Sequence, residues 1–261
     1  MSEIRDPRFE LACAAVKRAS EIISPLYQSD LKIMEKDNGS EVTKADRDSE
    51  ILIREMISKD FPEDNVVGEE FENIENGDAK FTWSIDPIDG TRAFSKGVPF
   101  FGTMIGLKDE SGPLFGMINL PALGESIWGY RGKGAFWKNQ RGEVSKCCIS
   151  KVDSVEASVL STSGAEYFKD KNLDDRFYDL VRKTKFHRTW GDCYGYSLLA
   201  TGRIDVMIDG SLEFWDILPL IPIIRESGGT ITDLKGEDPL SGYGAIACHP
   251  DLHQKILNHF I

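Results

Sequence analysis

Apolar residues near the start of the chain recur at helical spacing. Between residues 6 and 28 they fall every three or four positions, which predicts an amphipathic helix with one buried face: Phe9, Cys13, Val16, Ala19, Ile23 and Leu26. A polar stretch, residues 35 to 46, predicts a loop that leads into a second helix. The second helix contains Ile51, and we expect it to end near Phe61 because Pro62 follows.

Alternating apolar positions replace the helical spacing after residue 64. A short strand is expected over Asn65–Gly68, and Phe81, Trp83 and Ile85 alternate along the next strand. Four further strands are expected at residues 99–108, 114–120, 126–130 and 135–138. The turns between them are rich in glycine, as in DESGP and RGKG, so an antiparallel meander is favoured.

The pattern changes again near residue 150. Strands near Val159, Phe186, Val206, Ile231 and Ala245 alternate with helices near 173–184, 192–201, 216–227 and 250–260. Strand–helix alternation of this kind predicts a layered α/β lobe. We therefore expect an α+β lobe over residues 1–150 and an α/β lobe over 151–261, with a boundary between 140 and 155. Nothing at the boundary reads as a flexible linker, so the two lobes should form one compact unit.

Composition and charge argue against several classes of protein. The chain of 261 residues carries a net charge of −12 and shows no cluster of lysine and arginine, which argues against nucleic-acid binding. No apolar run approaches the roughly 18 residues of a membrane span, and the N-terminus is too polar for a signal peptide. The five cysteines form no C-x-x-C pair, so we expect a reduced cytoplasmic protein without disulfides or a zinc site.

The stretch WSIDPIDGTRAF, residues 83–94, contains the first candidate chemistry. Asp86 follows an apolar strand and Asp89 lies three residues further on, so their carboxylates can converge where the sheet ends. Two carboxylates and a backbone carbonyl are ligands that Mg²⁺ prefers, and Gly90 allows a ligand to approach the backbone. Thr91 can open a short helix whose N–H groups face an anion. The alternative for this stretch is a surface turn.

Other acidic residues occupy comparable positions and have ordinary alternatives of their own. Glu69 and Glu70 follow a strand and a glycine, and such acids are mostly solvated. Asp46 and Asp216 each precede an apolar helix, where an aspartate is often the N-cap. Asp216 can be both a cap and a metal ligand.

The order of these motifs resembles the inositol monophosphatase family of metal-dependent, lithium-sensitive phosphatases. The motifs are Asp46, Gly68-Glu69-Glu70, Asp86-Pro-Ile-Asp-Gly-Thr91, Trp215-Asp216 and Glu226-Ser-Gly-Gly229. The D-P-I-D-G-T string is highly specific in this context, and the resemblance covers nearly the whole chain. It implies an α/β fold layered αβαβα, of the inositol monophosphatase and fructose-1,6-bisphosphatase type. It also implies two or three Mg²⁺ ions in each active site and a homodimer.

The resemblance assigns roles by position. The metal ligands would be Glu69, Asp86, the carbonyl of Ile88, Asp89 and Asp216. Asp46 and Thr91, with Glu69, would orient and activate the attacking water, and the phosphate would lie on the N–H groups of Gly90 and Thr91. Bound Mg²⁺ neutralises a phosphate monoester and acidifies water, so no covalent nucleophile is needed.

The Thr-Asn-Phe of the inositol-cleaving members is replaced by Arg92-Ala93-Phe94. Residues 96–107 and especially residues 188–209, which contain G-D-C-Y-x-Y, resemble the histidinol-phosphate phosphatase branch more than those members. Histidinol phosphate carries an ammonium and an imidazole, so its pocket should offer carboxylates that do not bind metal. The candidate substrate contacts, beside Gly90 and Thr91, are Arg188, Asp192, Asp209 and Glu213.

Alternatives stay open for most of these contacts. Asp192 can be a helix N-cap, Glu213 can be solvated, and Arg188 and Tyr194 can line the pocket or only pack. The four histidines are expected to be surface or packing groups. The sequence therefore predicts Mg²⁺-dependent hydrolysis of L-histidinol phosphate to L-histidinol and phosphate, a step of histidine biosynthesis. The alternatives are an inositol- or sugar-phosphate phosphatase and a non-catalytic regulatory protein on the same fold. The intact acidic set argues against the regulatory protein.

Overall fold

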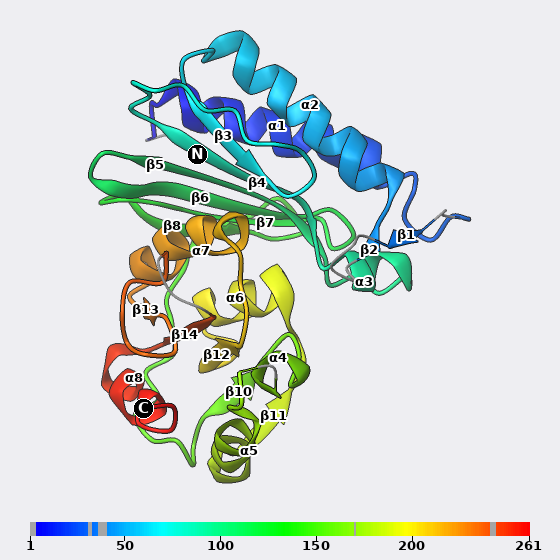
Figure 1. The fold of residues 1–261 in the computed structure, drawn as a ribbon. Coiled ribbons are helices and arrows are strands. Elements are labelled where there is room, and N and C mark those ends of the chain that lie inside the picture. Colours follow the sequence, from blue (N-terminus) through cyan, green and yellow to red (C-terminus); the bar gives the residue numbers. More distant parts are fainter. Residues whose placement is uncertain (1–3, 31–32, 36–40, 170, 241–243) are drawn as a thin grey trace.

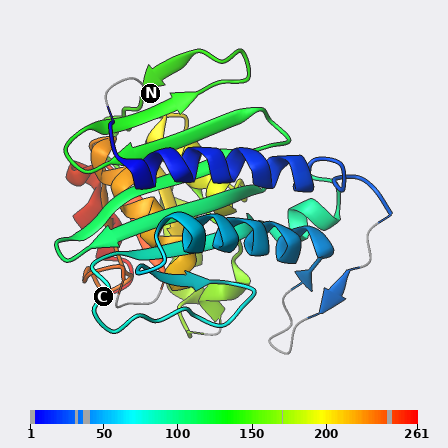
Figure 2. The same cartoon turned by 90° about the horizontal axis from the view of Figure 1, so that it is seen from above.

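The computed structural model describes residues 4–30, 33–35, 41–169, 171–240 and 244–261. Two sheets and three layers of helices alternate, as Figure 1 shows, in the predicted order αβαβα. The first layer consists of the helices α1 (Pro7–Ile23) and α2 (Lys44–Asp60), which lie side by side across the larger sheet in Figure 2. No helix among the described residues is long and apolar enough to cross a membrane.

The larger sheet is the predicted meander with one parallel strand added at its edge. Its strands are β3 (Asn65–Gly68), β4 (Thr82–Asp89), β5 (Gly102–Asp109), β6 (Gly112–Leu120), β7 (Glu125–Tyr130), β8 (Gly134–Lys138) and β9 (Val144–Lys146). They are paired in chain order and antiparallel from β4 onward, whereas β3 runs parallel to β4.

The smaller sheet is mixed and lies in the second half of the chain. Its strands are β10 (Val159–Ser161), β11 (Phe186–Arg188), β12 (Val206–Asp209), β13 (Thr230–Thr232) and β14 (Ala245–Cys248), in the order β11-β10-β12-β14-β13. The helices are α4 (Glu166–Lys169), α5 (Asp174–Lys183), α6 (Asp192–Ala200), α7 (Phe214–Glu226) and α8 (Pro250–Leu257). Every strand and helix predicted after residue 150 is confirmed, and α4 was not predicted.

Local sequence explains where the first two helices begin and end. Asp6 caps α1 and Pro7 occupies its first turn, but the helix ends at Ile23, not at residue 28 as predicted. Pro25 lacks the N–H that a further helical turn requires, so the chain turns there. Thr43 caps α2, and Phe61 ends it as expected.

The predicted loop over residues 35–46 is only partly confirmed. Residues 36–40 lie outside the described residues. The described part contains two short strands, β1 (Met34–Glu35) and β2 (Glu41–Val42), and the first turn of α2.

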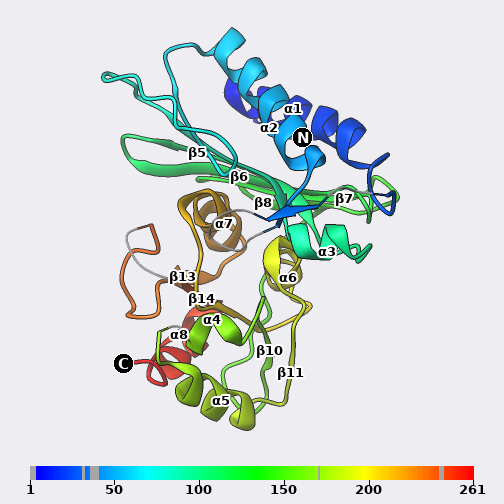
Figure 3. The ribbon, with the colours of Figure 1, turned by 45° about the vertical axis from the view of Figure 1, so that its right-hand side comes forward.

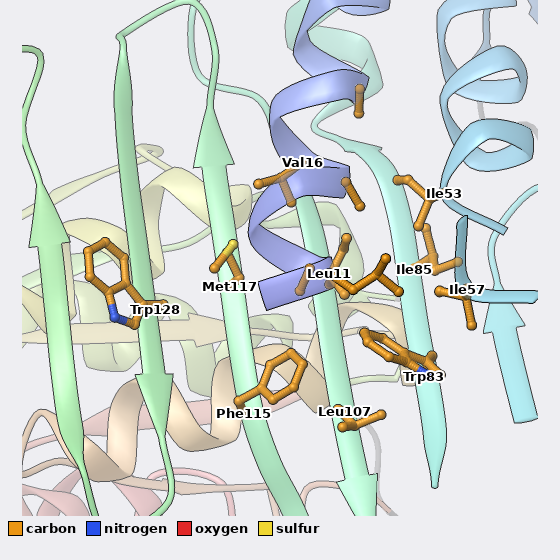
Figure 4. Close-up of a cluster of buried hydrophobic side chains, with 14 of the residues drawn as sticks. Leu11, Val16, Ile53, Ile57, Trp83, Ile85, Leu107, Phe115, Met117 and Trp128 are labelled. Carbon is orange, nitrogen blue, oxygen red and sulfur yellow. The ribbon is translucent and has the colours of Figure 1, made fainter. Parts of the chain in front are cut away.

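Three apolar clusters hold the layers together. The first lies between the larger sheet and the α1–α2 pair, where Val16, Ile53, Trp83 and Phe115 meet in Figure 4. The second fills the space between the two sheets around α6 and α7, and the third lies between the smaller sheet and the helices α5 and α8. Figure 3 shows that α7 lies against the larger sheet although it comes from the second half of the chain.

A row of glycines determines how closely α7 approaches the larger sheet. Gly106, Gly116 and Gly129 are direct partners on the neighbouring strands β5, β6 and β7. A Cβ atom at Gly116 would come within 1.8 Å of the Pro219 carbonyl oxygen on α7. The helix therefore lies directly on the backbone of three strands, and this contact fixes the position of every side chain that α7 carries.

Candidate metal centre

The two aspartates of the predicted motif lie at the end of β4, near the middle of the fold. The pairing of β4 with β5 shifts register between Asp86 and Asp89, so the strand is irregular there. The hydroxyl of Thr103 donates to the Pro87 carbonyl at 2.9 Å and holds this segment. Asp86 is 2% exposed and Asp89 is half-buried.

Asp216 joins these two aspartates from the first turn of α7. One carboxylate oxygen from each of Asp86, Asp89 and Asp216 lies within 4.8 Å of the other two. Asp216 is not the N-cap of its helix. The cap is Glu213, whose N–H donates to Asp216 Oδ2 at 2.8 Å in a capping box, so Asp216 both closes the cap and faces the cluster.

The electrostatics of the cluster favour a bound cation. Burial, and then the charges of Glu69 and Asp89, raise the pKa of Asp86 well above its ordinary value. Burial, and then Asp192, raise the pKa of Asp89, while the pKa of Asp216 rises to about 7, mainly through burial. Asp86 Oδ1 is buried and has no hydrogen-bond partner. Three hard oxygen donors with one of them unsatisfied are a set that fits Mg²⁺.

The other predicted ligands lie beside this cluster. Glu69 and Ile88 both line the same cavity as the three aspartates. The N–H of Glu69 donates to the Ile85 carbonyl at 3.2 Å, which extends the β3–β4 pairing to the carboxylate. The Ile88 carbonyl lies 2.9 Å from the Thr91 hydroxyl.

Asp46 and Thr91 form the contact that the resemblance implied. The Thr91 hydroxyl lies 3.2 Å from Asp46 Oδ1, across a long stretch of sequence. The other oxygen of Asp46 accepts from the N–H and the hydroxyl of Thr43, at 2.8 and 2.6 Å. Thr43 is thus the N-cap and Asp46 closes the capping box, so Asp46 is fixed behind Thr91 and does not line the cavity.

The cavity at this site has a volume of about 380 Å³ and an acidic lining. Its carboxylates are Glu41, Glu69, Asp86, Asp89, Glu166, Asp192, Glu213 and Asp216. Among the described residues that line it, Arg92 is the only lysine or arginine. A second cavity of about 390 Å³ between α1 and strands β6 to β8 contains two lysines and no carboxylate. Size does not distinguish the two cavities, but the chemistry of their linings does.

Asp192 occupies the wall opposite the strand end. Its N–H donates to Ser163 Oγ at 2.8 Å, and its φ of 52° is unusual for an aspartate. Gly191, not Asp192, is the residue at the N-cap position of α6. Burial, and then the charge of Asp209, raise the pKa of Asp192 to about 7. The next N–H, that of Cys193, donates to Asp89 and ties this wall to the metal ligands.

Gly90 allows these groups to approach each other. Its φ is 85°, and a Cβ atom there would lie 2.8 Å from the Phe100 carbonyl and 3.2 Å from Asp192 Oδ2. The helix α3 (Thr91–Ser95) begins at the next residue, as predicted, and no side chain caps it. Gly90 and Thr91 both line the cavity.

Asp209, predicted to contact substrate, lies behind the cavity wall. Its side chain is fully buried and does not line the cavity. Its carboxylate accepts from the Ser163 N–H at 2.7 Å and from the Tyr196 hydroxyl at 3.0 Å. Ser163 in turn binds Asp192, so Asp209 supports the wall from within the protein.

Arg188 and Tyr194 also lie outside the cavity lining. The Arg188 guanidinium is over the Phe186 ring at 5.1 Å and donates to the His187 carbonyl. Tyr194 stacks on Phe100, with ring centroids 4.4 Å apart. No histidine lines the cavity, which agrees with their predicted packing and surface roles. Of the predicted substrate contacts, Gly90, Thr91, Asp192 and Glu213 line the cavity.

Sequence reasoning missed several residues of the cavity. Glu41, Arg92, Ser163, Glu166 and Tyr167 all line it, and only Arg92 belongs to a motif that the sequence singled out. The others come from β2, from α4 and from the segment before α4, which carry no recognisable pattern.

Comparison with known proteins agrees with the geometry. The model of the inositol monophosphatase family matches residues 5–260. A histidinol-phosphatase of Chlorobaculum parvum is 35% identical over 253 residues, which cover 96% of this chain and 95% of that protein. A histidinol-phosphatase of Mycobacterium tuberculosis is 34% identical, with 95% of both chains covered.

The solved structures support the same assignment. An inositol monophosphatase from Zymomonas mobilis superposes with a TM-score of 0.84 at 31% identity, and the match covers 96% of both chains. The layered fold predicted from the sequence is thereby confirmed. A family match over nearly the full length, on a fold that gathers three carboxylates into one cluster, shows that this chain belongs to the inositol monophosphatase family of metal-dependent phosphatases.

Proposed function

We propose that the protein is a Mg²⁺-dependent phosphomonoesterase that hydrolyses L-histidinol phosphate to L-histidinol and phosphate. The observation that carries this proposal is the surplus of carboxylates in the cavity. After the expected metal ligands are set aside, Glu41, Glu166, Asp192 and Glu213 remain in the lining. Acidic groups that bind no metal favour an ester whose alcohol part is cationic.

Residues at the strand end would hold the metal. Asp86, Asp89, Asp216, Glu69 and the Ile88 carbonyl offer the oxygen ligands for two or three Mg²⁺ ions. When bound, Mg²⁺ would neutralise the phosphate and lower the pKa of a water molecule.

Other groups of the chain would bind and orient the reactants. The phosphate oxygens would accept from the N–H groups of Gly90 and Thr91, which open α3. The Thr91 hydroxyl would position the attacking water, because its own proton is directed toward Asp46 or the Ile88 carbonyl. Glu69 would take the proton that this water loses.

Histidinol suits the remaining part of the cavity better than inositol. Inositol is a neutral polyol and needs no counter-ion, whereas histidinol brings an ammonium and an imidazole that is partly protonated near neutral pH. Asp192 and Glu213, from the C-terminal half, both line the cavity within the same enclosure as the metal ligands. The similarity to histidinol-phosphatases of Chlorobaculum parvum and Mycobacterium tuberculosis supports the same choice.

Inositol- and sugar-phosphate hydrolysis is the second candidate. The metal centre alone would serve any phosphate monoester, and an inositol monophosphatase of known structure shares the fold at 31% identity. A non-catalytic regulatory role is disfavoured because the carboxylate cluster is complete. We further propose a cytoplasmic homodimer, from the family resemblance and from the five free cysteines.

The test compares phosphate release from L-histidinol phosphate and inositol 1-phosphate with Mg²⁺ present. We expect kcat/KM to favour histidinol phosphate by about 100-fold, equivalent to about 2.7 kcal/mol. Asp192→Asn should raise KM for histidinol phosphate and leave that for inositol 1-phosphate nearly unchanged. Asp179→Asn, on the exposed face of α5, is the matched control. Comparable rates with the two esters would contradict the proposal and indicate a generalist phosphatase.

A further inference from the structure

Arg92 is the only basic residue among the described residues that line the acidic cavity. It is the second residue of α3, directly after the metal motif, and its side chain is 60% exposed. One guanidinium nitrogen lies 3.9 Å from Glu166 Oε1, on the other side of the cavity. The charge of Arg92 also opposes the rise in the pKa of Asp192. Arg92 therefore pairs with Glu166, and its charge also acts on Asp192.

The Glu166 carboxylate lies over the backbone of Gly164. A Cβ atom at Gly164 would lie 2.6 Å from the Glu166 carboxylate, so the side chain folds back over a glycine. Glu166 opens the short helix α4 and is 64% exposed. An exposed ion pair at 3.9 Å is loose, and such pairs contribute little to stability. A second cation can therefore replace the guanidinium at low cost.

We propose that Arg92 is an internal counter-ion, which pairs with Glu166 near Asp192 in the free enzyme and yields these carboxylates to the cationic group of the substrate. The inference rests on the proposed function, because it concerns the same cavity and the same class of ester. Exchange conserves charge: the ammonium of the substrate replaces the guanidinium beside the carboxylates, and the guanidinium moves into solvent. An ester without a cation leaves the Arg92–Glu166 pair intact and gains no affinity from this wall of the cavity.

The inference gives Arg92 a role in selectivity that differs from phosphate binding. If Arg92 served the phosphate, its removal would weaken all esters alike. As a competing cation, its removal should favour cationic ligands over neutral ligands of the same shape. The ratio of the affinities for a cationic and a neutral ligand distinguishes these two roles, whereas a single affinity does not.

The probes are 3-aminopropylphosphonate and propylphosphonate, which differ by one ammonium and cannot be hydrolysed as esters. Their dissociation constants are measured by calorimetry in the presence of Mg²⁺, and the ratio of the two reports the preference for a cation. We expect the wild-type protein to prefer the amino compound. Arg92→Gln should increase that preference about 2- to 5-fold, and Glu166→Gln should decrease it by a similar factor. In the double variant, the gain from Arg92→Gln should shrink.

Arg182→Gln is the control, because Arg182 pairs with Asp179 on the exposed face of α5. An unchanged ratio in Arg92→Gln, or equal weakening of both phosphonates, would overturn the inference. Histidinol-phosphate turnover by the same preparations separates this failure from failure of the proposed function. A protein that hydrolyses histidinol phosphate no faster than inositol 1-phosphate, yet shows the expected ratios, would recognise a different cationic ester through the same exchange.

Discussion

The two sides of the cavity hold their carboxylates in different ways. On the metal side, Asp86 lies within strand β4, and Asp216 is fixed by its own helix cap on a helix that lies directly on the sheet backbone. Among the carboxylates that are not expected to bind metal, Glu166 belongs to a four-residue helix and Glu213 is exposed, whereas Asp192 is half-buried and burial raises its pKa to about 7. Apart from Asp192, the carboxylates of the metal ligands are therefore held rigidly and the others are held loosely. This difference suits the two tasks, since charge stabilisation requires fixed groups and substrate selection tolerates adjustable ones.

The strongest test of this contrast removes one carboxylate from the rigid side. Asp89→Asn should lower kcat by about 10³-fold or more, about 4 kcal/mol, because an amide supplies less negative charge to a metal. Calorimetric titration with Mg²⁺ should show weaker binding, and the far-ultraviolet circular dichroism spectrum should not change. Asp179→Asn, on α5, removes an exposed carboxylate as the control. Normal turnover in Asp89→Asn would remove the metal assignment.

The rigid and the loose side were not equally visible in the sequence. Asp86 and Asp89 belong to a motif that follows an apolar strand, so their convergence could be predicted. Glu166 could not, because its place in the cavity depends on the fold-back over Gly164 and on the packing of the two sheets. Asp209, predicted to contact substrate, does not line the cavity, and a sequence does not reveal that Ser163 and Tyr196 enclose its carboxylate.

The elements of the fold also differed in how far the sequence predicted them. Longer elements with a clear period were predicted within a few residues, as β5 and α5 illustrate. The two-residue strand β1 and the four-residue helix α4 were missed, because neither two residues of a strand nor a single helical turn shows a period in the sequence. The glycine row under α7 could not be recognised before the strand register was known, because Gly106, Gly116 and Gly129 are far apart in the chain.

A second test changes the packing of α7 on the larger sheet, which supports the metal side of the cavity. Gly116→Ala places a Cβ atom 1.8 Å from the Pro219 carbonyl, so α7 must move away from the sheet and take Asp216 with it. We expect a loss of about 1–3 kcal/mol in the free energy of unfolding, measured with urea, together with weaker Mg²⁺ binding. Gly77→Ala is the control, since nothing lies within 4 Å of a Cβ atom there.

The two readouts separate packing from metal positioning. If Gly116→Ala lowers stability and leaves Mg²⁺ affinity unchanged, the glycine row supports the fold and does not position Asp216. If both change, addition of Mg²⁺ should restore part of the lost stability, because a ligand that binds only the folded state stabilises it.

The smallest expected effect concerns the pH dependence of stability without metal. Burial raises the pKa of Asp216 to about 7 in the folded chain, against about 4 in the unfolded chain, and raises those of Asp86 and Asp89 as well. The folded protein thus binds more protons than the unfolded chain between these values. The stabilising contribution is complete below pH 4 and is lost as the pH rises through 7.

Without Mg²⁺, the thermal unfolding temperature should therefore fall by a few degrees between pH 5 and pH 8. Saturating Mg²⁺ should remove or reverse this slope, because the metal favours the ionised carboxylates and competes with protons at low pH.

Asp216→Asn should flatten the slope in the metal-free protein, since the amide stays neutral at every pH. Asp109→Asn should not, because Arg131 holds the pKa of that carboxyl below its ordinary range and it does not titrate between pH 5 and 8. A slope that persists when Asp86, Asp89 and Asp216 are all replaced by Asn would assign the effect to buried acids away from the metal side, such as Asp209, whose pKa burial also raises. The two sides of the cavity would then differ in the rigidity of their carboxylates, but the pH dependence of stability would not distinguish them.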